Sequence, residues 1–214
     1  MLSALVTIGR AARDTIRSLP MMIFANLLWL AFSLTIVLFP FATAGLYTVT
    51  NRIAYKQKTR LADFIAGGRG YLGPSLRWTL INLTAFGAIY VTTTYDPVEK
   101  HIPTWLQGMS VLAGIAWAAL QFYVWPFLME QPNKRVRAAV RNAMLLGITD
   151  PIYTLTLLSS VGFIVWLSLR TSTPIGIFMM SFIALLGNRA IIERLAAYGR
   201  SPEPDNVFRF QQRQ

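Results

Sequence analysis

Long apolar runs dominate the chain, and polar or charged segments separate them. Each run begins beside a proline, and these prolines are Pro20, Pro40, Pro74, Pro103, Pro151 and Pro174. Proline suits the first turn of a helix, because an N–H at that position would have no intrahelical partner. Asp150 and Thr173 each precede one of these prolines and are good N-cap residues. The pattern predicts six helices, at residues 21–39, 41–57, 75–95, 104–129, 151–169 and 175–196.

The predicted helices have the lengths of transmembrane spans. At about 1.5 Å per residue, five of them are long enough to cross a hydrocarbon core about 30 Å thick. The helix at 41–57 is shorter and is rich in small residues, namely Ala42, Thr43, Ala44, Gly45 and Thr48. Small residues allow close helix packing in membranes, so we expect this helix inside the bundle. The predicted fold class is an all-α integral membrane protein, a bundle of six transmembrane helices of which the second is short.

The composition agrees with a membrane protein. Of the 214 residues, 54% are hydrophobic and 14% are charged, whereas about a quarter of the residues are charged in a soluble domain. No Ser/Gly-rich or charged linker divides the chain, so we expect one transmembrane domain over residues 20–197. A cytoplasmic interfacial helix at 1–19 precedes it and a cytoplasmic tail at 198–214 follows it. The chain has no cysteine, which excludes a disulfide framework and a thiolate metal site.

The positions of Lys and Arg predict the orientation. All of the 20 basic residues except Lys100 and Arg170 fall in four segments. These segments are the N-terminal one, residues 51–77, residues 130–141 and the tail from Arg189. Six spans place all four segments on the same side, which the positive-inside rule assigns to the cytoplasm. We therefore expect a multi-pass protein of the cell's inner (plasma) membrane with both termini in the cytoplasm.

Residues 1–19 predict an amphipathic helix. One face carries the apolar residues Leu2, Leu5, Ile8, Ala12, Ile16 and Leu19, and the opposite face carries Arg10, Asp14 and Arg17. This distribution is typical of a helix that lies on the cytoplasmic membrane surface. Together with the first span, the segment also imitates a cleavable signal peptide. Its apolar run is longer than a usual signal core, so we expect it to stay uncleaved.

A second basic amphipathic stretch follows the fourth span. Its cations are Lys134, Arg135, Arg137 and Arg141. Arg137 and Arg141 are four residues apart and so share one helical face, beside an apolar face of Val136, Val140 and Met144. One interpretation is a surface helix that lipid phosphates anchor; the other is a docking element for a cytoplasmic partner. The net charge of +11 comes mostly from such flanks of spans, so we expect no nucleic-acid partner.

Candidate catalytic and metal sites are scarce. His101 is the only histidine and has Glu99 nearby, and one histidine with one carboxylate does not make a metal site. The glycine-rich segment at 67–70 superficially resembles a phosphate loop. No strand precedes it and no Lys-Ser or Lys-Thr pair closes it, so we expect a flexible basic loop. The sequence therefore predicts no enzyme, no metal and no cofactor.

The polar residues inside the predicted spans are mainly amides and hydroxyls. Asn26, Asn82 and Gln121 are the main amides, and we expect them to link helices rather than to bind a substrate. Arg189 lies near the cytoplasmic end of the last span, and we expect its side chain to reach the interface. Pro126 predicts a kink near the end of the fourth span. No carboxylate lies deep in a span, although a proton- or sodium-coupled transporter would ordinarily need one.

Three stretches together resemble one family of bacterial membrane proteins. The first is Asn26-Leu27-Leu28-Trp29 followed by residues 39–44, the second is Leu61-Ala62-Asp63-Phe64 leading to Pro74, and the third is Pro126 followed by Arg141-Asn142-Ala143, Gly147 and Pro151. They cover most of residues 20–160 and resemble the YesL-like family, a domain of unknown function. The family often has an acidic residue shortly after the position of Pro126, and here Glu130 is followed by Gln131-Pro132. The resemblance implies an accessory role beside carbohydrate ABC transporter components, with no catalytic residue to transfer.

The leading function hypothesis is a non-enzymatic accessory or structural subunit of a larger membrane assembly, such as a carbohydrate ABC transporter. Its partners would be the lipid bilayer and other membrane-protein subunits, and the basic helix at 133–144 would dock one of them. The alternative is a small independent transporter or permease that uses Asn26, Asn82 and Gln121. A membrane enzyme acting on lipid ranks third, because the catalytic groups are missing.

Overall fold

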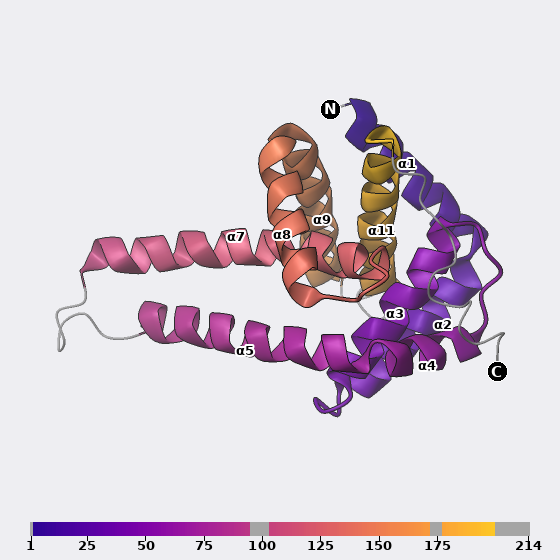
Figure 1. Cartoon of the computed structure of the whole chain (residues 1–214), viewed down its shortest axis with the longest axis horizontal. Helices are drawn as coiled ribbons and strands as arrows, with labels where there is room; N and C mark the ends of the chain where they lie inside the picture. The colour runs from indigo at the N-terminus through magenta and orange to yellow at the C-terminus, as the bar shows by residue number, and fades with distance from the viewer. Residues whose placement is uncertain (1, 95–102, 172–176, 200–214) are drawn as a thin grey trace.

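The structure is a computed structural model that describes residues 2–94, 103–171 and 177–199. These residues form helices without strands, and Figure 1 shows their arrangement. The helices are α1 (Leu2–Arg17), α2 (Leu19–Ser33), α3 (Phe39–Ala54), α4 (Leu61–Gly70), α5 (Leu72–Thr94), α7 (Thr104–Met129), α8 (Val136–Thr149), α9 (Pro151–Thr171) and α11 (Met179–Ala197). The predictions for Glu99, His101, Thr173, Pro174 and the tail from residue 200 fall outside the described residues.

Prolines begin several helices, as the sequence predicted. Pro20 and Pro40 lie in the first turns of α2 and α3, and Pro103 is the N-cap of α7. Pro151 is the first residue of α9, and the preceding Asp150 acts as the cap. Its Oδ1 accepts a hydrogen bond from the backbone N–H of Tyr153 at 3.4 Å. Local sequence therefore determines where these helices start.

The short helix α3 lies at the centre of the fold, and most of its 16 residues are buried. The helix α4 crosses α3 at glycines of both helices. The prediction of a flexible loop at 67–70 was wrong, because these residues form the end of α4. A Cβ on Gly45 would lie 2.6 Å from the carbonyl oxygen of Phe64, and a Cβ on Gly67 would overlap Thr48. A Cβ on Gly68 would likewise overlap the ring of Phe41. These positions are occupied by glycine because the close contact between α3 and α4 leaves no room for a side chain.

The N-terminal helix α1 packs against α11, and most of its large apolar residues point away from the protein. Ala4, Thr7 and Asp14 are buried, whereas Leu2 is 82% exposed and Ile16 is 75% exposed. The helix is confirmed, but the face that packs within the protein carries Ala4, Thr7, Ala11 and Asp14, whereas Arg10 and Arg17 of the charged face are exposed. Arg189, which we expected to reach the interface, is buried and pairs with Asp14 of α1.

Two of the described helices, α7 and α9, are individually long and apolar enough to cross a membrane. A third span is available if α1 and α2, which meet at an angle of 91°, form one broken segment. Figure 1 shows α5 and α7 side by side, extending beyond the other helices, with α8, α9 and α11 running crosswise to them in this view. The remaining described helices are shorter or more polar. Among the described residues, two or three segments are therefore long and apolar enough to cross a membrane.

Candidate functional site

The connection between α7 and α8 carries charged side chains to the ends of neighbouring helices. Glu130 is the C-cap of α7 and accepts two hydrogen bonds from the end of α3. Its Oε1 accepts from Asn51 Nδ2 at 2.8 Å, and its Oε2 accepts from the hydroxyl of Tyr55 at 2.7 Å. Burial raises the pKa of Glu130, and these two hydrogen bonds partly oppose that effect. Both carboxylate oxygens are therefore engaged within the protein.

Lys134 lies four residues further on and binds the end of α4. Its Nζ donates to the carbonyl oxygen of Gly70 at 2.9 Å and lies 4.1 Å from the centre of the Tyr71 ring. The second contact is a cation–π interaction. Lys134 also adopts a backbone φ of +47°, a left-handed conformation that costs free energy in a residue with a side chain. Burial lowers the pKa of this amine, and we assign it a structural role.

Three arginines line a cavity of 820 Å³ between α5 and α8. We call it the cationic cleft, and its charged residues are Arg77 at the start of α5 and Arg135 and Arg137 at the start of α8. Trp78 and Trp117 form part of its wall, with ring centroids 5.6 Å apart. All three arginines are exposed, and none of them forms an ion pair with another described residue. The cleft therefore concentrates positive charge that no described carboxylate neutralises.

The four cations that the sequence grouped together have different surroundings. Arg135 and Arg137 line the cleft, Lys134 is held by α4, and Arg141 is exposed outside the cleft lining. Arg77 was missing from the predicted group because it lies far from the others along the chain. Its position beside Trp78 at the start of a predicted span was the available signal, since Arg and Trp both favour the membrane interface.

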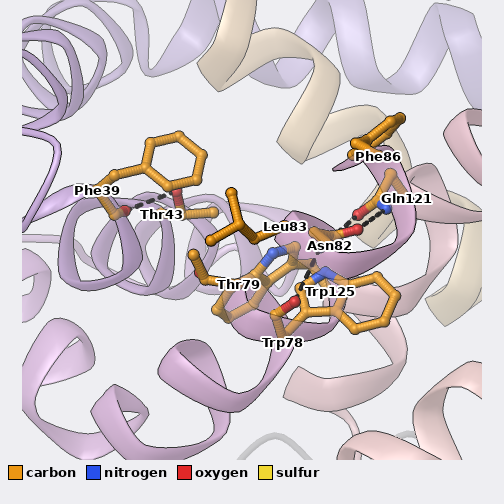
Figure 2. Close-up of a pocket in the computed structure, with 9 residues that line it drawn as sticks. All are labelled: Phe39, Thr43, Trp78, Thr79, Asn82, Leu83, Phe86, Gln121 and Trp125. Atoms are coloured by element: carbon orange, nitrogen blue, oxygen red, sulfur yellow. Dashed lines mark hydrogen bonds between the residues drawn. The ribbon is translucent and has the colours of Figure 1, made fainter. Parts of the chain in front are cut away.

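The amides Asn82 and Gln121 come together between α5 and α7 (Figure 2). Asn82 Oδ1 accepts hydrogen bonds from Trp117 Nε1 at 2.9 Å and from Gln121 Nε2. Asn82 Nδ2 donates to the carbonyl oxygen of Trp78 at 3.0 Å. Asn82 and Gln121 border a largely apolar cavity of 410 Å³, which Phe39, Phe86 and Trp125, among others, also line. In this arrangement the amide pair links two helices.

Asn26 serves a different pair of helices. It is fully buried on α2, and its Oδ1 accepts hydrogen bonds from the backbone N–H groups of Met180 at 3.1 Å and Ser181 at 3.2 Å. Both N–H groups belong to the first turn of α11, whose amides lack intrahelical acceptors. Asn26 thus caps α11 from another helix. It does not line the cavity beside Asn82 and Gln121, so the three amides do not form one site.

Ion pairs join α1 to α11, and sequence reasoning missed them. Arg189 Nε donates to Asp14 Oδ2 at 2.6 Å, and the two residues are only 9% and 7% exposed. One turn later, Glu193 accepts hydrogen bonds from Arg10 at 3.0 Å and from the hydroxyl of Thr7 at 2.5 Å. The only signal in the sequence was charge complementarity between two segments about 175 residues apart, which no local pattern reveals.

Comparison with known protein families, with curated proteins and with solved structures finds no match to this chain. The resemblance to the YesL-like family therefore stays a prediction. Among the residues that the structure describes, no group of three or more His, Asp or Glu side chains is placed to hold a metal ion. Any functional proposal for this chain must rest on its surfaces and cavities.

Proposed function

We propose that this chain is a non-enzymatic accessory or structural subunit of a larger assembly in the bacterial inner membrane. In this proposal it has six spans and both termini in the cytoplasm. One observation carries the proposal, namely the apolar surface of the pair formed by α5 and α7. This pair is called the arm below, and Figure 1 shows how far it extends beyond the other helices.

The outer surface of the arm is apolar over most of its length. Leu83 on α5 is 72% exposed and Leu112 on α7 is 67% exposed, and further large apolar residues of the arm are also exposed. These further exposed residues are Leu80, Phe86, Tyr90, Val91, Trp105, Met109 and Ile115. Helices with uncovered apolar faces in a membrane pack against lipid or against helices of another subunit. A two-helix arm offers such a subunit far more contact than a closed bundle would.

Two glycines on the arm favour packing by another helix. Gly87 and Gly108 are both exposed, and a Cβ added to either would meet no atom within 4 Å. Their lack of a side chain therefore serves no contact with the described residues of this chain. Glycines on a membrane helix allow a partner backbone to approach closely. The family resemblance suggests components of a carbohydrate ABC transporter as the partner.

A small independent transporter is the second candidate, and the cavity beside Asn82 and Gln121 favours it (Figure 2). The volume of 410 Å³ is large enough for a small molecule. The two amides, however, hydrogen-bond to each other and to Trp117. A substrate would have to break those bonds to use them.

The test is purification from native membranes with a photo-cross-linking side chain at Leu83 or Leu112. We expect a discrete partner in fixed stoichiometry, and Gly108→Leu should remove it while leaving the thermal unfolding of the isolated chain unchanged. The matched control is Gly162→Leu on α9, where a Cβ also has free space. Cross-links to lipid alone, together with flux of a small solute through reconstituted protein, would support the transporter and overturn the accessory role.

A further inference from the structure

We infer that the cationic cleft and an apolar groove next to it form one binding site for an anionic phospholipid. The phosphate would lie among Arg77, Arg135 and Arg137, and an acyl chain would occupy the groove. This site lies where α5 and α7 meet α8, and it does not depend on a partner subunit. The groove has a volume of 560 Å³ and lies between α7, α8 and α9. Residues that line it include Ala116, Leu120, Ala143, Gly147, Leu155 and Leu158.

The cationic end has the chemistry that binds a phosphate diester. Arginine presents a planar fork of N–H donors that matches two phosphate oxygens. Arg135 is the N-cap of α8, so the positive end of that helix dipole adds to the charge of the three side chains. Glu130, the acidic residue at the end of α7, already binds Asn51 and Tyr55. Three guanidinium groups in one cavity repel each other unless an anion lies between them.

The groove continues the cleft along α8. Both cavities include Trp117 in their walls. Arg137 and Val140 line the cleft, and Met144 and Gly147 line the groove. These four residues recur at intervals of three or four, so they follow one face of the helix. The site therefore has a cationic end and an apolar end on a single surface.

The groove itself is suited to a hydrocarbon chain. Its lining is almost entirely aliphatic and aromatic, and the hydroxyls of Tyr123 and Thr154 hydrogen-bond to each other at 3.2 Å. A Cβ added to Gly147 would meet no atom within 4 Å, which leaves the groove wide at this point. Its walls include α7 and α9, the two helices able to cross a membrane, so acyl chains of the bilayer have access. A soluble anion or an acidic peptide would use the arginines without needing this groove.

The experiment measures phosphatidylglycerol binding to the full chain in phosphatidylcholine nanodiscs, through fluorescence quenching by a spin-labelled acyl chain. Arg77→Gln/Arg135→Gln/Arg137→Gln should weaken phosphatidylglycerol binding by about tenfold or more, because each cation near an anionic lipid contributes to the attraction. The charge-matched control is Arg13→Gln/Arg17→Gln/Arg141→Gln, which removes three exposed arginines outside the cleft and should bind as the unmodified chain does. Equal loss in both variants would overturn the site in favour of general surface attraction.

A second pair of variants tests the apolar end. Gly147→Leu should fill the groove and weaken phosphatidylglycerol binding, whereas Gly162→Leu, with equal free space outside the groove, should not. Soluble glycerol phosphate should compete weakly with the unmodified chain, because it lacks an acyl chain. Competition as strong as that of the lipid would overturn the inference and indicate a site for a soluble anion. Displacement of the lipid by a soluble acidic peptide at similar concentration would likewise overturn it and indicate a protein-docking surface.

Discussion

At the residue scale, glycines allow α3 and α4 to pack closely. Gly45 and Gly67 lie where α3 and α4 cross, and a Cβ on Gly45 would come within 2.6 Å of the carbonyl oxygen of Phe64. Backbone atoms cannot move aside as a flexible side chain can. Forcing atoms into a packed core costs typically about 1–3 kcal/mol and occasionally more. The crossing of α3 and α4 therefore tolerates no side chain at these positions.

We expect Gly45→Leu and Gly67→Ala to lower the thermal unfolding temperature of the purified protein. Gly162→Ala on α9 is the control, because its Cβ has free space and alanine has the higher helix propensity. The control should leave the unfolding temperature unchanged or raise it. A similar effect of all three substitutions would show that the crossing of α3 and α4 is looser than described.

Glu130 should make stability depend on pH. Burial raises its pKa above the ordinary value, so the folded protein binds the proton more tightly than the unfolded chain does. The stabilisation from this group is complete below the ordinary pKa and is lost as pH rises through the raised value. We therefore expect Glu130→Gln to gain stability relative to the unmodified chain as pH increases across this window. Unfolding curves between pH 4 and 8 provide the measurement, and a constant difference between the two proteins would contradict it.

At the scale of the elements, α1 is attached to α11 by a buried ion pair. Removing one partner of such a pair leaves an uncompensated charge and costs about 3–5 kcal/mol, whereas replacing both often costs little. We expect Arg189→Met to destabilise the protein strongly and to expose α1 to protease. Asp14→Leu/Arg189→Met should be more stable than Arg189→Met alone. Additive effects of the two substitutions in a double-mutant cycle would show that Asp14 and Arg189 do not interact.

The elements also show how far sequence patterns reach. Periodicity identified α1 as an amphipathic helix, but it could not tell which face the protein covers, because in a membrane the apolar face can point outward. The helix α4 was missed because glycine disfavours helices in isolation, and here its contact with α3 outweighs that preference. Arg135 and Arg137 were found from local charge. Arg77 was not, since the fold alone brings α5 beside α8.

At the scale of the whole molecule, the arrangement of basic residues bears on topology. Between Trp78 and Asn133 the chain has a single basic residue, Lys100, although this stretch includes most of the arm. Arg77 and Arg135 border the stretch and meet in one cleft. A helical hairpin that enters and leaves the membrane on the same side has its cations in this arrangement. We therefore expect the arm to cross the membrane twice, with the cleft at the cytoplasmic surface.

Single cysteines can test this topology, since the chain has none of its own. Thr104→Cys lies at the far end of α7, and Lys58→Cys lies between α3 and α4. In intact cells an impermeant thiol reagent should label position 104, whereas position 58 should react only after the membrane is opened. Protection of both positions would mean that the arm lies along the cytoplasmic surface, in the crosswise orientation that it has relative to α9 in Figure 1. Six spans would then be excluded, because α5 and α7 supply two of them.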